Sequence, residues 1–155
     1  MTHHKLGDFG QARILIVEDE SIIAMDIAMQ LRELGHQVVG QASSGEQAID
    51  LAQRLRPDLV LMDVQLKGVM DGIDAAQTIR SRFNLPCLFL SAFANDSDSL
   101  TRAALAAPVG YLSKPFFEHE LRSVMEIALR QLGPVSYTHL RAHETDSYLV
   151  CRLLL

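Results

Sequence analysis

The sequence predicts an α/β fold in which a doubly wound five-stranded parallel sheet carries helices on both faces. Three observations lead to this expectation. Short apolar runs alternate with stretches of helical periodicity five times between residues 12 and 132. The runs are apolar throughout, which is typical of strands that are covered on both faces. Alternating strands and helices indicate a parallel sheet, and right-handed crossovers between its strands place helices on both faces.

Each expected strand is short and rich in aliphatic residues. We expect strands at residues 14–17, 38–39, 59–62, 86–90 and 109–112. Between them, apolar residues recur three or four positions apart, which predicts helices over residues 23–34, 44–55, 73–79, 100–107 and 121–132. Ser44 and Gln47 have the spacing of a capping box at a helix start. Gly35 and Pro57 stand where helices are expected to end.

Composition narrows the class of protein. A chain of 155 residues suits one domain. The net charge of −5, without clustered Lys or Arg, argues against direct binding of nucleic acid. Cys87 and Cys151 are too few for a disulfide framework, which fits a reducing compartment. No apolar run approaches the roughly 20 residues that span a bilayer, and residues 1–11 lack a signal-peptide core. We therefore expect a cytoplasmic protein with no membrane segment.

The chain divides into an N-terminal arm at residues 1–11, one domain at 12–132 and a tail at 133–155. The tail follows the helix stop Gly133-Pro134 and loses the preceding apolar periodicity. Residues 135–145 are what one reading frame of a transposase-type sequencing adapter encodes, and residues 149–155 match the next adapter segment. We interpret the tail as translated adapter DNA and exclude it from the fold. A genuine C-terminal extension is the alternative.

Polar side chains stand at the carboxyl ends of the expected strands. Glu18 and Asp19 follow the first strand, Asp63 the third, Ser91 the fourth and Lys114 the fifth. Ligands of such sheets bind outside the carboxyl ends of the strands, so we expect these groups at one edge. Neighbouring carboxylates repel one another, and a divalent cation removes that cost. Oxygen ligands without Cys or His favour a hard ion, Mg²⁺ or alternatively Mn²⁺.

The same groups suit phosphoryl transfer. Asp63 is a carboxylate nucleophile, Lys114 can pair with Asp63 or with a phosphoryl oxygen, and Ser91 can donate a hydrogen bond to another such oxygen. Phosphoryl transfer depends on positioning and charge neutralisation more than on elaborate covalent chemistry. A nucleophile, a metal, an ammonium and a hydroxyl are therefore sufficient.

Four motifs at the strand ends carry a family resemblance. They are I-L-I-V-E-D-E at 14–20, D-L-V-L-M-D at 58–63, F-L-S-A at 89–92 and G-Y-L-S-K-P-F at 110–116. In this order they resemble the receiver domains of two-component response regulators, the CheY-like superfamily, over residues 12–132. The resemblance implies the flavodoxin-like (βα)₅ receiver fold. The loop within residues 66–76 is longer than in the commonest receivers.

The resemblance also implies a role for each acidic residue. Asp63 would be the phosphoacceptor, carried as a 4-aspartylphosphate after the reaction. Glu18 and Asp19 would hold Mg²⁺ together with Asp63, and the backbone carbonyl of Gln65 would complete the protein ligands.

The remaining implied roles concern switching. Lys114 would pair with a phosphoryl oxygen, and Pro115 would follow it in a cis peptide. Ser91 would contact the phosphoryl group and reorient on phosphorylation, and Tyr111 would turn inward as Ser91 moves.

The implied function is that of a switch rather than an enzyme. Its phosphoryl group would come from a sensor histidine kinase or a phosphotransfer protein, and at most it would catalyse its own phosphorylation and dephosphorylation. Ser91 and Tyr111 lie beside residues 100–107, 109–112 and 121–132, so we expect this face to meet an output partner or a second copy of the chain. The output partner or output domain is not identified by the sequence.

Two rival functions stay open. A pseudo-receiver would bind partners without taking a phosphoryl group, but such modules usually lose the acceptor, an acidic residue or the lysine, and all are present here. Phosphatases of the haloacid-dehalogenase type also use a strand-end Asp and Mg²⁺. They carry a second Asp two residues later as general acid, where this chain has Gln65.

Some histidines and methionines are expected to be structural residues without a role in a metal or cofactor site. His36 and His119 have no partners at metal-ligand spacing and are expected at the surface. Met25, Met29 and Met125 are expected to pack in the core.

Overall fold

The computed structural model describes residues 11–92 and 97–132, in which strands and helices alternate along the chain. The strands are β1 (Arg13–Val17), β2 (Gln37–Ala42), β3 (Leu59–Asp63), β4 (Cys87–Ser91) and β5 (Gly110–Ser113). The helices are α2 (Ser21–Glu33), α3 (Gly45–Leu55), α4 (Gly72–Phe83), α5 (Ser97–Leu105) and α6 (Glu118–Leu132). Residues 1–10 of the expected arm at 1–11, and the whole tail at 133–155, lie outside the described residues.

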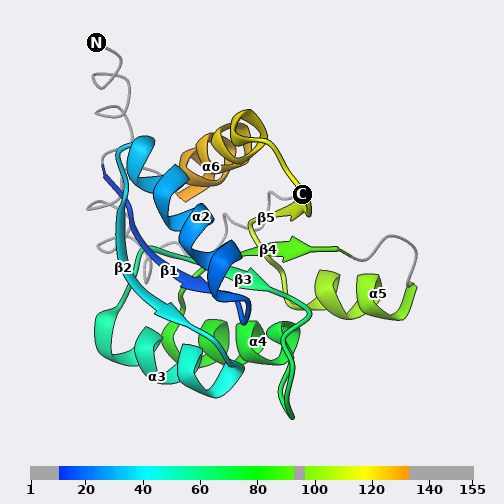
Figure 1. The fold of residues 1–155 in the computed structure, drawn as a ribbon. Helices are drawn as coiled ribbons and strands as arrows, with labels where there is room; N and C mark the ends of the chain where they lie inside the picture. The colour runs from blue at the N-terminus through cyan, green and yellow to red at the C-terminus, as the bar shows by residue number, and fades with distance from the viewer. Residues whose placement is uncertain (1–10, 93–96, 133–155) are drawn as a thin grey trace.

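The sheet has the order β2-β1-β3-β4-β5, and every neighbouring pair is parallel. The predicted doubly wound α/β fold is therefore confirmed (Figure 1). Within the described ranges, none of the helices has the length and apolar character needed to cross a membrane.

The sheet separates two hydrophobic cores. Side chains of a strand point alternately to its two faces, and β3 shows the consequence. Val60 and Met62 pack with α3, α4 and Ala103 of α5, whereas Leu59 and Leu61 pack with α2 and α6. Figure 1 shows α2 and α6 on one side of the sheet and α3, α4 and α5 on the other. Burial on both faces explains why the strands read as continuous apolar runs.

The helix ends follow the local signals in the sequence. The Ser44 hydroxyl caps α3 by accepting from the Gln47 N–H at 3.1 Å. Gln47 Oε1 accepts from the Ser43 N–H at 2.8 Å, one residue before the donor of an ordinary capping box. Gly35, with φ of 97°, follows α2 in a backbone conformation that favours glycine. α3 ends at Leu55 and is followed by Arg56, whose backbone is left-handed.

β2 is longer than the two residues expected from the sequence. It pairs with β1 along its whole length, with an irregularity between Ile14 and Leu15. Gly40 has low intrinsic strand propensity, yet it pairs with Leu15 of β1. A Cβ at Gly40 would lie 2.9 Å from Leu55 Cδ1, so α3 packs closely over this strand. Pairing with β1 therefore overrides local propensity.

The surface prediction for His36 is wrong. Its side chain is only 6% exposed, and its Nδ1 accepts from the Ala12 N–H at 3.3 Å. Burial lowers the pKa of His36 below its usual value. His119 is exposed, as expected, and stacks on the Phe117 ring.

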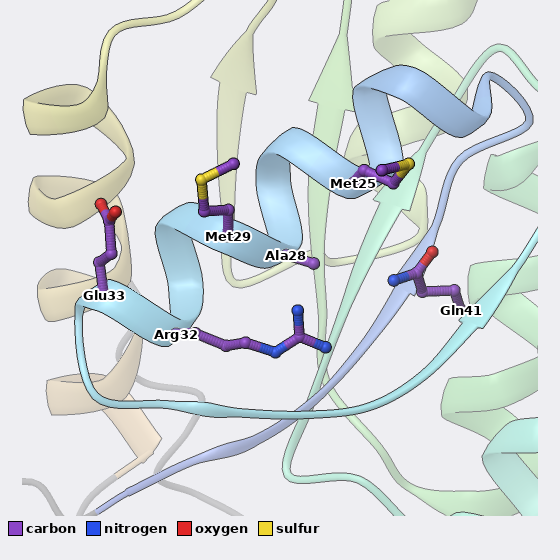
Figure 2. A pocket seen from close by; sticks show the side chains of 6 residues that line it. All are labelled: Met25, Ala28, Met29, Arg32, Glu33 and Gln41. Carbon is purple, nitrogen blue, oxygen red and sulfur yellow. The ribbon is translucent and has the colours of Figure 1, made fainter.

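The packing prediction is confirmed for Met125, which is buried against the sheet. It is wrong for Met25 and Met29, which are 63% and 54% exposed. Both border a hollow of about 470 Å³ between α2 and β2. Figure 2 shows the side chains that line it: Met25, Ala28, Met29, Arg32, Glu33 and Gln41. None of them belongs to the strand-end groups singled out in the sequence.

Candidate functional site

Three carboxylates converge at the carboxyl ends of two adjacent strands. Glu18 and Asp19 directly follow β1, and Asp63 is the last residue of β3, which pairs with β1. Each of the three offers an oxygen, and these oxygens lie within 4.8 Å of one another. We call Glu18, Asp19 and Asp63 the acidic cluster. The structure thus brings together residues that lie up to 45 positions apart in the sequence.

Lys114 reaches the acidic cluster from the segment after β5. Its Nζ lies 3.0 Å from Glu18 Oε1 and 3.4 Å from Asp63 Oδ2. Burial would lower the pKa of Lys114, but the hydrogen bond to Glu18 and the charge on Asp63 outweigh it and raise the pKa. Lys114 is therefore held as an ammonium. The backbone N–H of Lys114 donates to the Ser91 carbonyl at 2.8 Å. The Lys114-Pro115 peptide is cis, as the resemblance implied.

One ammonium does not balance three carboxylates. The Glu18 side chain has no exposed surface. Its burial raises its pKa, the hydrogen bond from Lys114 opposes this, and the neighbouring charge of Asp63 raises the pKa further. A group whose charged form is disfavoured in this way gains from a second cation. The donors are all oxygen, the set preferred by Mg²⁺. The acidic cluster therefore has the composition and proximity to hold a metal ion.

Backbone amides orient all three carboxylates. The Gln65 N–H donates to Asp63 Oδ1 at 3.0 Å, the Lys67 N–H to Asp19 Oδ2 at 3.1 Å, and the Glu20 N–H to Glu18 Oε2 at 3.2 Å. Sequence reasoning missed these donors, because they depend on the path of the loops rather than on residue type. Gln65 lies at the cluster, and metal ligation by its carbonyl stays a prediction.

Ser91 and Tyr111, the two residues expected to switch, differ in burial. Ser91 ends β4 and is 5% exposed, and the preceding residue pairs with Asp63. Tyr111 lies on the edge strand β5 and is 45% exposed. Its ring meets Phe89 edge to face, with centroids 6.0 Å apart. The structure thus places Ser91 next to the acceptor and Tyr111 on the outer edge of the sheet, and their switching roles stay predictions.

The close packing of Gly72 against the acceptor strand was not predicted from the sequence. Gly72 is the first residue of α4, and its N–H donates to the Val64 carbonyl at 3.2 Å. A Cβ at this position would lie 2.0 Å from the carbonyl oxygen of Asp63, closer than any side chain can come. The preceding Asp71 caps α4 by accepting from the Asp74 N–H. An Asp-Gly pair before a helix was the available signal.

Comparison with known proteins agrees with this geometry. The family model described as "Response regulator receiver domain" matches residues 14–126. The transcriptional regulatory protein PdtaR of Mycobacterium tuberculosis is 42% identical over 124 residues, which cover 80% of this chain and 60% of PdtaR. The phyllosphere-induced regulator PhyR of Methylorubrum extorquens is 33% identical over 117 residues, which cover 75% of this chain and 43% of PhyR. The chain thus spans less than two thirds of these relatives.

Solved structures give the same result. The signal receiver domain of a modulated diguanylate cyclase from Desulfovibrio desulfuricans superposes with a TM-score of 0.73 at 35% identity, covering 79% of this chain and 96% of that one. The PhyR response regulator REC domain of Erythrobacter litoralis gives a TM-score of 0.68 at 34% identity, covering 78% and 92%. The residues matched by the family model form most of this sheet and its helices, and the chain belongs to the response regulator receiver domain family.

Proposed function

We propose that this chain is a phosphoacceptor switch of a two-component phosphorelay in the cytoplasm. In it, Asp63 takes a phosphoryl group from a sensor histidine kinase or a phosphotransfer protein. The observation that carries the proposal is the convergence of Glu18, Asp19 and Asp63 within 4.8 Å, with the Lys114 ammonium bonded to two of them. The domain that performs this would be residues 12–132, with the arm and tail outside it.

In the proposed reaction a carboxylate oxygen of Asp63 attacks the phosphorus of a phosphohistidine. The new O–P bond forms as the P–N bond breaks, and the electron pair of that bond returns to the imidazole of the donor. Lys114 lies 3.4 Å from Asp63 and can donate to a phosphoryl oxygen. Ser91, at the end of the next strand, would donate to another. The Gln65 N–H fixes the Asp63 carboxylate in one orientation.

The residues that would hold Mg²⁺ are Glu18, Asp19, Asp63 and the backbone carbonyl of Gln65. The ion would neutralise the charge that gathers on the acceptor and on the phosphoryl oxygens. Mn²⁺ has the same preference for oxygen ligands and would serve in its place.

The output would pass through the face formed by α5, β5 and α6. Four apolar side chains of these three elements are exposed by between 43% and 72%: Leu100, Leu105, Tyr111 and Ile127. A face of this kind suits a partner protein or a second copy of the chain. On phosphorylation, Ser91 would reorient and Tyr111 would turn inward, which changes the populations of two packings. Amide spectra that change only around Asp63 on phosphorylation would contradict this part of the proposal.

A second candidate is partner binding without phosphorylation. It draws support from a similar solved structure, the anti-anti-sigma factor PhyR of Bartonella quintana, 30% identical over 82% of this chain. The complete set of Asp63, Lys114 and acidic neighbours favours the switch. A phosphatase is less well supported, because Gln65 offers no acid at the position where such enzymes carry one. We therefore expect no turnover of other phosphate esters.

The test is to weigh the intact chain after incubation with Mg²⁺ and a small acyl phosphate. We expect one phosphoryl adduct in the wild type and in Asp50→Asn, which changes an exposed carboxylate on α3. Asp63→Asn should give none, although an amide oxygen can still accept from the Gln65 N–H. An adduct that survives in Asp63→Asn, or no adduct in a folded wild type, would overturn the proposal, and the latter would favour the phosphorylation-independent module.

Metal binding is tested separately by unfolding. Mg²⁺ at ten times its Kd should raise the free energy of unfolding by about 1.4 kcal/mol. Glu18→Gln should reduce this gain, since it removes one charged ligand from the acidic cluster. Equal stabilisation of both proteins would place the ion elsewhere.

A further inference from the structure

Arg102 joins α5 to the start of α4. Its Nη1 donates to Asp71 Oδ2 at 2.9 Å, and its Nη2 donates to Asp71 Oδ1 at 3.2 Å and to Asp74 Oδ1 at 2.9 Å. The guanidinium thus makes two parallel hydrogen bonds to one carboxylate and a third to the next. Such a bidentate pair fixes geometry as well as adding energy, and a lysine cannot reproduce it. We call Arg102, Asp71 and Asp74 the α4–α5 clamp.

Asp71 links the clamp to the acceptor strand. While it accepts from Arg102, its Oδ1 also accepts from the Asp74 N–H at 2.9 Å and so caps α4. The next residue, Gly72, packs its Cα against the Asp63 carbonyl and donates to Val64. The position of Asp71 therefore sets how closely α4 approaches the backbone of the phosphoacceptor.

The loop of residues 64–71 is attached at both ends. At one end the Gln65 and Lys67 amides donate to the acidic cluster. At the other end the α4–α5 clamp holds Asp71. α5 follows β4, which ends at Ser91. The clamp thus connects the two segments that leave the sheet on either side of the site.

The clamp is an electrostatic contact in a partly hydrated place. The side chains of Arg102, Asp71 and Asp74 are 43%, 31% and 49% exposed. Burial would raise the pKa of Asp71, but the hydrogen bonds from Arg102 and from the Asp74 amide outweigh it and lower the pKa. The pair is therefore charged at neutral pH, and salt would weaken it without abolishing it.

We propose that Arg102 is a positioning residue that holds the loop 64–71 against the acidic cluster, and so couples the position of α5 to metal binding and phosphoryl acceptance at Asp63. The coupling to the metal and to phosphorylation rests on the function proposed above, whereas the effect on the loop does not. Because such coupling is reciprocal, a displacement of α5 on phosphorylation would strain the α4–α5 clamp. A partner that holds α5 in place would favour the position of the loop 64–71 that binds the metal.

The experiment compares Arg102→Gln with Arg54→Gln in the 155-residue chain without metal. Arg54 is the matched control, because it makes an exposed ion pair with Asp50 on α3. The readout is hydrogen exchange at the amides of Gln65 and Lys67, followed by NMR. Loss of a partly exposed ion pair should speed their exchange about fivefold in Arg102→Gln. We expect no change in Arg54→Gln and an intermediate rate in Arg102→Lys, which keeps the charge but not the fork.

Core amides in β3 and β4 separate positioning from general destabilisation. Equal acceleration of core and loop amides in Arg102→Gln, or unchanged loop amides, would overturn the proposal. Calorimetric titration then gives the Mg²⁺ affinity, which should fall about fivefold in Arg102→Gln. If the wild type itself binds no Mg²⁺, the proposed metal site fails, while the loop amides still decide whether Arg102 positions the loop.

Discussion

Gly72→Ala is expected to strain the backbone of the phosphoacceptor itself. The added Cβ would meet the Asp63 carbonyl oxygen at 2.0 Å and the Val64 Cα at 2.7 Å. Both are backbone atoms between two fixed elements, so no side chain can rotate out of the way. An ordinary contact begins near 3.4 Å, so α4 and β3 must separate by about 1.4 Å, the difference between 3.4 and 2.0 Å.

That separation has two costs. It stretches the 3.2 Å hydrogen bond from Gly72 to Val64 beyond hydrogen-bonding range, which removes about 1 kcal/mol. Overpacking adds about 1–3 kcal/mol. The lower entropy of the unfolded alanine chain returns about 0.5 kcal/mol. The net loss is about 1.5–3.5 kcal/mol. With a urea m-value of about 2 kcal/mol/M, this lowers the urea midpoint by about 1–2 M.

The matched control is Gly110→Ala. A Cβ there would approach Leu88 Cδ1 at 2.7 Å, but that atom is the end of a flexible side chain. Its adjustment should cost about 1 kcal/mol or less. Circular dichroism in urea measures both variants, since the chain has no Trp for fluorescence. A Gly72→Ala midpoint equal to that of Gly110→Ala would refute the argument from the close contact.

Three further predictions concern buried or capping groups. Burial lowers the pKa of His36, so the folded state keeps it neutral while the unfolded chain takes a proton near pH 6.5. The contribution of the neutral His36 to the free energy of unfolding is therefore present above pH 6.5 and lost as the pH falls. As the pH falls below 6.5, the free energy of unfolding should therefore decrease less in His36→Asn than in the wild type. Parallel pH profiles of the two proteins would contradict this. Burial raises the pKa of Cys87 to about 12, so in Cys151→Ser this thiol should resist disulfide reagents at neutral pH until urea is added. Rapid reaction of the native protein would disprove that. Ser44→Ala should lower the free energy of unfolding by about 1 kcal/mol through loss of the α3 cap, and an unchanged urea midpoint would show that the cap is unimportant.

The acidic cluster could be predicted because it depends on topology alone. Once the runs ending at Glu18 and Asp63 are recognised as parallel strands of one sheet, their carboxyl ends must share an edge. Lys114 follows from the same rule. No knowledge of side-chain packing is needed, and the structure brings all of these groups into contact.

Features that depend on how helices are turned could not be predicted in this way. α2 has apolar residues on most of its circumference, so periodicity did not show that Met25 and Met29 face outward. The burial of His36 depends on the approach of the Ala12 amide, which is distant in the sequence. Arg102 reads as an ordinary solvated arginine until α5 is placed beside Asp71.

The division of the interior by the sheet has an evolutionary consequence. Ile79 packs in the core beneath α3 and α4, and Leu129 packs in the core beneath α6, with the sheet between them. Residues that share no neighbours usually contribute to stability additively. Epistasis should therefore be strong within each core and weak across the sheet. One face can then diverge to suit new partners while the other keeps the packing that supports α4 and its contact with Asp63.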